Sequence, residues 1–223
     1  MQKVECQSTL IPAGSVDLAA DIAIPYTPSG LVLFAHGSGS SRHSPRNRWV
    51  AGVLNRASMG TILIDLLAEP EEIADRETAE YRFDIGLLTA RLTSVTDWIG
   101  THARLRSLEL GYFGASTGAA AALAAAAERP DVIRAIVSRG GRPDLAGASL
   151  HRVHAASLFI VGGADPVVLR LNQEAAAQMP HDTEKRIEVV PGATHLFEEP
   201  GTLERVSELA AEWFRKHFAS HAR

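Results

Sequence analysis

The sequence predicts an α/β fold: a mostly parallel, twisted sheet with helices on both faces and no cap domain. Two observations carry this prediction. Short continuous apolar runs, typical of buried strands, alternate with longer segments whose apolar residues recur every three or four positions. Parallel strands need crossover connections, and right-handed helical crossovers cover both faces of such a sheet. The 223 residues show no internal repeat or low-complexity linker, so we expect one domain over residues 1–223.

The elements follow in order along the chain. Residues 4–24 carry apolar runs broken at 12–14, which predicts two strands joined by a hairpin. Buried strands are then predicted at residues 31–35, 61–67, 107–113, 132–138, 157–161 and 186–190. Helices are predicted at residues 49–57, 85–99, 117–128, 169–179 and 203–218. The acidic segment 68–81 is either a helix beside a site or a solvated connector, and we favour the connector.

Composition excludes several classes of protein. The formal net charge of -4 lacks the basic excess of a nucleic-acid-binding protein. Cys6 is the only cysteine, so no intrachain disulfide can form and the sequence has no sign of an oxidising compartment. The first residues lack the apolar core of a signal peptide, and no window approaches the roughly 18 apolar residues of a membrane span. We therefore expect a cytoplasmic protein without nucleic-acid or membrane partners.

The sharpest chemical signal is the sequence GASTG at residues 114–118, between a predicted strand and a predicted helix. A G-x-S-x-G sequence in this context predicts a tight elbow that projects the serine oxygen above the sheet. Small residues are needed on both sides of the strained serine, and Gly114 and Gly118 meet that need. Ser116 is therefore the predicted nucleophile.

A serine nucleophile needs a base and a group that orients the base. Asp165 follows the predicted strand 157–161, and His195 follows the predicted strand 186–190. The carboxyl ends of parallel strands border the ligand crevice of an open sheet, so we expect Ser116, Asp165 and His195 to converge there.

These motifs together identify the chain as resembling the α/β-hydrolase superfamily, in its dienelactone-hydrolase-like branch. The resemblance spans roughly residues 31–218, and it is carried by HGSG at 36–39, GASTG at 114–118, GGADP at 162–166 and GATH at 192–195. The chain order serine, aspartate, histidine is that of this superfamily, which favours His195 over His36 as the base. Dienelactone hydrolase itself has a cysteine at the elbow, so Ser116 argues against dienelactone as the substrate.

The resemblance also implies an oxyanion hole. In this superfamily one backbone N–H follows the nucleophile and a second comes from the loop after the third strand, which indicates Thr117 and Ser38. His36 is expected to shape that loop.

Arginines after two of the strands are candidate anion ligands. Arg139 and Arg142 follow the predicted strand 132–138, where they could hold a carboxylate or phosphate of a substrate, and solvated surface is an equally good interpretation. Arg42, Arg46 and Arg48 follow the loop at 36–39, and for these we favour solvated surface.

The expected function is hydrolysis of a small ester, thioester or lactone through an acyl-enzyme on Ser116. No cofactor and no metal are implied, the expected partner is a small ester-like molecule, and a homodimer is compatible with the sequence. Two alternatives stay open: an acyltransferase that uses the same triad, and a hydrolase fold that only binds a ligand.

Overall fold

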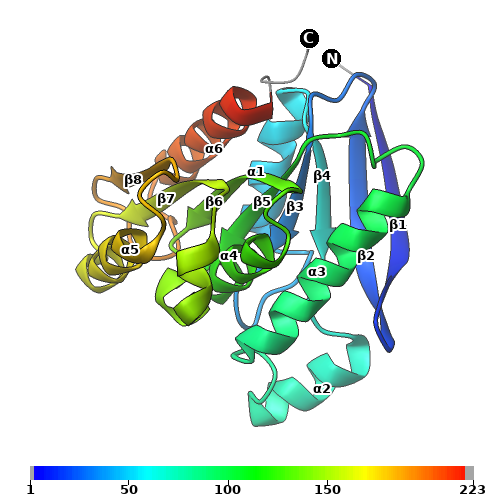
Figure 1. Ribbon diagram of the computed structural model, residues 1–223, viewed down its shortest axis with the longest axis horizontal. Coiled ribbons are helices and arrows are strands. Elements are labelled where there is room, and N and C mark those ends of the chain that lie inside the picture. The colour runs from blue at the N-terminus through cyan, green and yellow to red at the C-terminus, as the bar shows by residue number, and fades with distance from the viewer. Residues whose placement is uncertain (1–2, 219–223) are drawn as a thin grey trace.

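The computed structural model describes residues 3–218, which form an eight-stranded twisted sheet with helices on both faces (Figure 1). The strands are β1 (Val4–Ala13), β2 (Val16–Pro25), β3 (Leu31–Ala35), β4 (Gly60–Ile64), β5 (Leu110–Ala115), β6 (Ile133–Arg139), β7 (Ala156–Gly162) and β8 (Lys185–Val190). Their order across the sheet is β1-β2-β4-β3-β5-β6-β7-β8. The first two strands pair antiparallel, and all neighbours from β4 to β8 are parallel. The predicted fold class is confirmed.

Two groups of helices cover the sheet. The helices are α1 (Pro45–Arg56), α2 (Glu69–Thr78), α3 (Ile85–Thr101), α4 (Thr117–Glu128), α5 (Pro166–Gln178), α6 (Thr202–Phe218) and the 3-10 helix η1 (Pro143–Arg152). One apolar core packs the sheet against α1 and α6, and the other packs it against α3, α4, α5 and η1. The alanine-rich α4 lies at the centre of the second core, where its small side chains allow close approach to the sheet.

The acidic segment 68–81 is helical, so the expectation of a connector was wrong. Glu71 accepts the backbone N–H of Ala68 at 2.8 Å, which caps the first turn of α2. Glu71 also pairs with the buried Arg91 of α3 at 2.6 Å. These contacts hold α2 against the body of the protein, near the carboxyl ends of β3 and β4 (Figure 1).

The strand predicted at residues 61–67 ends earlier, at Ile64. Asp65 accepts the backbone N–H of Arg42 at 2.7 Å, and the N–H of Leu66 donates to a ring nitrogen of His36 at 3.0 Å. Because these groups bind the loop after β3, the chain leaves the sheet at this point.

The parallel strands bring their following loops to one edge of the sheet. The connection between β6 and β7 contains only η1, in agreement with the expected lack of a cap domain. No helix within residues 3–218 has the length and apolar character needed to cross a bilayer.

Candidate active site

Ser116 lies at a strained turn between β5 and α4. Its backbone has φ +50° and ψ −122°, a conformation that is costly for a residue with a side chain. Both flanking glycines are sterically required. A Cβ on Gly114 would lie 2.4 Å from the Ala119 Cα, and a Cβ on Gly118 would lie 2.3 Å from the Ala35 carbonyl oxygen. The GASTG sequence therefore forms the elbow that it predicts.

His195 and Asp165 lie within hydrogen-bond distance of each other. The Nδ1 of His195 is 2.8 Å from Oδ2 of Asp165, although the two residues are 30 positions apart. Oδ1 of Asp165 accepts the N–H of Val168 at 3.3 Å and so caps α5. With Nδ1–H donating to the carboxylate, Nε2 of His195 carries the free lone pair that a general base needs.

Two backbone contacts join the aspartate loop to the histidine loop. The N–H of Ala164 donates to the carbonyl of Ala193 at 2.9 Å, and that of Gly163 donates to the carbonyl of Val190 at 2.8 Å. Glu199 then braces the chain before His195, since it accepts from both the N–H and the hydroxyl of Thr194. Sequence reasoning missed this role of Glu199, which lies in an exposed turn with no motif around it.

Ser116 and His195 flank the same short segment of chain after β6. The N–H of Ser116 donates to the carbonyl of Arg139 at 3.3 Å. A Cβ on the next residue, Gly140, would lie 2.9 Å from the His195 carbonyl oxygen and 3.6 Å from its Cε1. On the other side, a Cβ on Gly37 would lie 3.0 Å from the Ser116 Cβ. Loops from β3, β5, β6, β7 and β8 thus meet around the serine.

The two residues expected at the oxyanion hole are in direct contact. The N–H of Ser38 donates to Oγ1 of Thr117 at 3.0 Å, across 79 positions of sequence. The threonine hydroxyl therefore holds the loop after β3 against the first residue of α4. An oxyanion at Ser116 would compete with this hydroxyl for the Ser38 N–H.

His36 anchors the same loop as a neutral imidazole. Its Nδ1 lies 2.9 Å from the Gly37 carbonyl, which can only accept, and its Nε2 receives the Leu66 N–H. These two bonds require the proton on Nδ1 and a lone pair on Nε2. Burial lowers the pKa of His36, with the hydrogen bond to Gly37 acting in the opposite direction.

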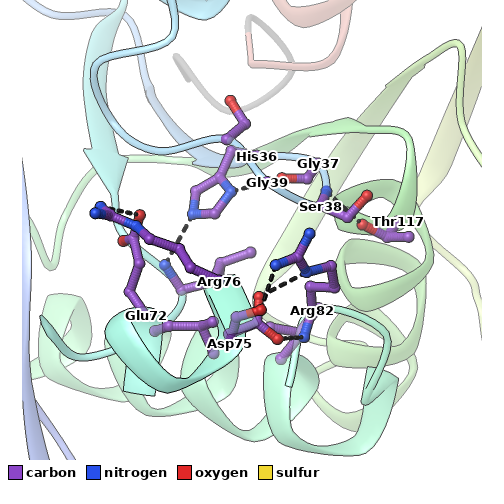
Figure 2. A pocket seen from close by; sticks show the side chains of 13 residues that line it. His36, Gly37, Ser38, Gly39, Glu72, Asp75, Arg76, Arg82 and Thr117 are labelled. Carbon is purple, nitrogen blue, oxygen red and sulfur yellow. Dashed lines mark hydrogen bonds and ion pairs between the residues drawn. The ribbon is translucent and has the colours of Figure 1, made fainter. Parts of the chain in front are cut away.

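A cavity of about 280 Å³ opens beside this loop, bounded by α2 and the ends of β3 and β4 (Figure 2). Ser38 and Thr117 contribute to its wall, and Ser116 is outside the lining set. Leu66, Leu67 and Leu88 supply its apolar surface. The cavity thus combines an apolar wall with charged groups from α2 and the chain that follows it.

The arginines of this cavity have carboxylate partners. Nε of Arg82 donates to Oδ2 of Asp75 at 2.7 Å (Figure 2). Asp75 also accepts the backbone N–H groups of Tyr81 and Arg82. Arg76, whose side chain is largely exposed, pairs with Glu72 one helical turn earlier at 3.2 Å.

The other candidate arginines differ from one another. Arg142 forms two parallel hydrogen bonds with Asp144, at 2.9 and 2.8 Å, so its guanidinium is committed to a neighbouring residue. Arg139 is buried beside Asn47. The expectation of solvated surface was wrong for Arg42, which pairs with the largely buried Asp65.

Among residues 3–218 no group of three or more histidine, cysteine, aspartate or glutamate side chains is arranged to hold a metal ion.

Similar solved structures show the α/β-hydrolase fold, and no family model matches the chain. Est1E from Butyrivibrio proteoclasticus has a TM-score of 0.79 at 15% identity, over 96% of this chain and 99% of that chain. An α/β serine hydrolase homologue from Coxiella burnetii has a TM-score of 0.75 at 17% identity, over 92% of this chain and 96% of that chain. The fold is therefore that of the α/β hydrolases.

A solved structure with higher sequence identity shows to which branch of the α/β-hydrolase family the chain belongs. Dienelactone hydrolase from Anabaena variabilis is 51% identical, with a TM-score of 0.93 over 96% of this chain and 98% of that chain. The chain belongs to the dienelactone-hydrolase-like branch of the α/β-hydrolase family, as its motifs predict.

A curated relative is a longer protein. A Mycobacterium tuberculosis (strain H37Rv) protein, whose name assigns it provisionally to the phosphoribosyl transferases, is 57% identical over 207 residues. The match covers 93% of this chain and 45% of that protein, so the chain spans less than half of the relative's length.

Proposed function

We propose that this chain is a serine hydrolase that cleaves a small ester, thioester or lactone through an acyl-enzyme on Ser116. The observation that carries the proposal is the 2.8 Å contact between His195 Nδ1 and Asp165 Oδ2, beside a serine held at φ +50°. With Nδ1 bonded to Asp165, Nε2 of His195 is the ring nitrogen left to accept the Ser116 proton.

The proposed reaction has two steps. Ser116 Oγ attacks the acyl carbon and its proton passes to Nε2 of His195, while Asp165 stabilises the imidazolium. The N–H groups of Thr117 and Ser38 bind the oxyanion, and His195 returns the proton to the leaving oxygen or sulfur. Water then gives a proton to His195 and attacks the acyl-enzyme, and His195 passes that proton to Ser116 Oγ as the acid is released.

The site favours small substrates. The 280 Å³ cavity next to Ser38 and Thr117 is at the lower end of the range for small-molecule pockets, about 300 Å³. Its leucine wall suits a short apolar acyl or alcohol group.

One of the similar proteins supports this proposal by its name, and the other does not. Dienelactone hydrolase supports cleavage of an ester-type bond, although Ser116 stands at the elbow of this chain. The provisional phosphoribosyl transferase name describes a protein in which the matched region is 45% of the length. The match does not say which part of the longer protein carries that activity.

The test is hydrolysis of p-nitrophenyl esters from acetate to octanoate. We expect Ser116→Ala and His195→Ala to lower kcat by about 10⁶-fold, and Asp165→Asn to lower it by about 10⁴-fold. Ser94→Ala is the matched control, because Ser94 lies on α3 and its hydroxyl bonds the Ala90 carbonyl of the same helix. Unchanged rates in the three triad variants would contradict the proposal.

A serine-directed fluorophosphonate probe separates the alternatives. Labelling that depends on Ser116, without hydrolysis of any ester, would mean that the substrate class is wrong. Faster release of the acyl group with an added alcohol or amine, and the corresponding acylated product, would support an acyltransferase. Folded protein that neither labels nor hydrolyses would be a ligand-binding module.

A further inference from the structure

Arg139 is a buried arginine with almost no protein partner. The residue is 7% exposed at the end of β6, and its carbonyl accepts the N–H of Ser116. Within the part of the chain that the structure describes, neither Nε nor Nη1 has an acceptor, and Nη2 reaches Asn47 Oδ1 only at 3.5 Å. The backbone of Arg139 thus contacts the nucleophile, and its guanidinium lies against Asn47 of α1 with most of its donors unused.

This arrangement is unfavourable for folding alone. Burying a charged group without a counter-charge is costly, and buried charges in proteins are normally paired. Burial, reinforced by the nearby charge of Arg46, lowers the pKa of Arg139 to about 10, so the side chain stays charged at neutral pH. An anion is the partner that would offset this cost.

The surroundings of Arg139 favour an anion. Asn47 and Arg46 lie in the first turn of α1, after the N-cap Ser44, where the helix carries partial positive charge. The Nε of Arg46 is also buried without an acceptor. Its Nη1 pairs at 2.9 Å with Glu198, whose side chain is 63% exposed. Arg46 thus pairs with an exposed carboxylate, whereas Arg139 has no carboxylate partner among residues 3–218.

We propose that Arg139, Arg46 and the first turn of α1 form a binding site for the anionic group, carboxylate or phosphate, of the substrate whose acyl carbon Ser116 attacks. The proposal rests on the proposed function. Glu198 follows His195 by three residues, so this loop borders both the triad and the anion site. Because the Glu198 carboxylate is exposed, it can exchange for a ligand oxyanion on Arg46, whose charge acts on the neighbouring Arg139.

The site differs from the cavity beneath α2. There Arg82 and Arg76 already have Asp75 and Glu72 as partners. An added anion would have to displace these carboxylates, whereas at Arg139 it would meet unused donors. A substrate can thus place its apolar part in the cavity and its anionic part near α1.

The first experiment compares neutral and anionic esters. We expect wild type to prefer mono-p-nitrophenyl succinate or p-nitrophenyl 3-phosphonopropanoate over p-nitrophenyl butyrate. Arg139→Met should lower kcat/KM for the preferred anionic ester by about 10-fold or more, the effect of one lost charge-assisted hydrogen bond, and change the neutral ester less than about 2-fold. The two anionic esters distinguish a carboxylate from a phosphate-type ligand.

Arg170→Met is the matched control, because Arg170 is an exposed arginine paired with Glu174 on α5. It should leave the preference between esters unchanged. Arg139→Lys keeps the charge and should retain part of the preference for the anionic ester. Equal preference for both esters in wild type, or an equal loss for both in Arg139→Met, would overturn the proposal.

A second experiment does not depend on catalysis. Inorganic phosphate or succinate should raise the Tm of wild type and of Arg170→Met, and should not raise that of Arg139→Met. If no ester is hydrolysed but this stabilisation depends on Arg139, the proposed function fails and the anion site stands. No stabilisation of wild type, or the same stabilisation of Arg139→Met, would overturn the anion site.

Discussion

On one side of Ser116, the cavity beneath α2 is lined by arginines that each have a carboxylate partner, Asp75 for Arg82 and Glu72 for Arg76. On the other side, at the end of β6, Arg139 is buried with two nitrogens that have no acceptor among residues 3–218. Both regions flank the same strand, β5.

The comparison distinguishes charges with a structural role, near α2, from a charge suited to ligand binding, on Arg139. The charges near α2 balance one another and hold the helix in place, so they need no ligand. The charge of Arg139 contributes a cost to folding that only a bound anion would offset. An unpaired buried charge is therefore a better indicator of a ligand than a larger number of paired charges.

The largest effect that this comparison predicts is at Asp75. Asp75→Ala removes the acceptor of two backbone N–H groups and of Arg82, and we expect a loss of about 3 kcal/mol in the free energy of unfolding. Glu72→Ala, which breaks an exposed pair with Arg76, should cost no more than about 0.5 kcal/mol. Urea denaturation measures both, and equal losses would contradict the assigned role of Asp75.

A second prediction concerns catalysis at the cavity wall. Thr117→Val removes the hydroxyl that holds the Ser38 N–H, so the loop after β3 should become less well positioned and kcat should fall about 10-fold. Thr117→Ser should restore most of the rate, since it keeps the acceptor. A rate increase in Thr117→Val would show instead that the hydroxyl competes with the oxyanion.

Low pH should destabilise the folded protein through His36, which lines the cavity beneath α2. Its pKa is lower in the folded protein than the unfolded value near 6.5, so below that pH the unfolded state binds a proton that the folded state does not. Stability should fall as the pH drops from about 6.5 toward the folded pKa, by at most about 1.4 kcal/mol per pH unit from this group. Tm measured from pH 7.5 to 5 tests this.

His217 also has a pKa lowered by burial and adds to the same acid dependence. His217→Gln is therefore the background in which to examine His36→Gln. In that background, adding His36→Gln should reduce the dependence of Tm on pH that remains. A slope that His36→Gln leaves unchanged would rule out the neutral imidazole assigned to His36.

The smallest expected effect concerns the free energy of unfolding of an Arg139 variant. Unlike Asp75→Ala, this substitution should not lower the free energy of unfolding. Arg139→Met removes an uncompensated buried charge, so we expect the free energy of unfolding to stay constant or to rise by about 1 kcal/mol. Arg142→Met breaks a partly exposed pair with Asp144 and should lower it by up to about 1 kcal/mol. Chemical denaturation without added anions checks both values. A large loss in Arg139→Met would assign Arg139 a structural role.

Local patterns predicted most of the fold. The helix expected at residues 85–99 is α3, Ile85–Thr101, and the strand expected at residues 31–35 has those bounds. The helical periodicity of the first and the continuous apolar run of the second both depend on nearby residues alone. The prediction of a connector at residues 68–81 was wrong because the N-cap residue of α2 is Ala68, which has no capping side chain. Glu71 caps the helix instead, and its other carboxylate oxygen pairs with Arg91.

The sequence by itself determined the position of the elbow and the candidate residues Asp165 and His195 at the ends of their strands. These depend on strand order and on glycines that must approach the backbone closely. Only the tertiary structure decided which charges have partners: Asp144 for Arg142, Asp75 for Arg82, and almost nothing for Arg139. The physical reason is that ion pairing depends on distance and burial in space, which the spacing of arginines along the chain does not encode.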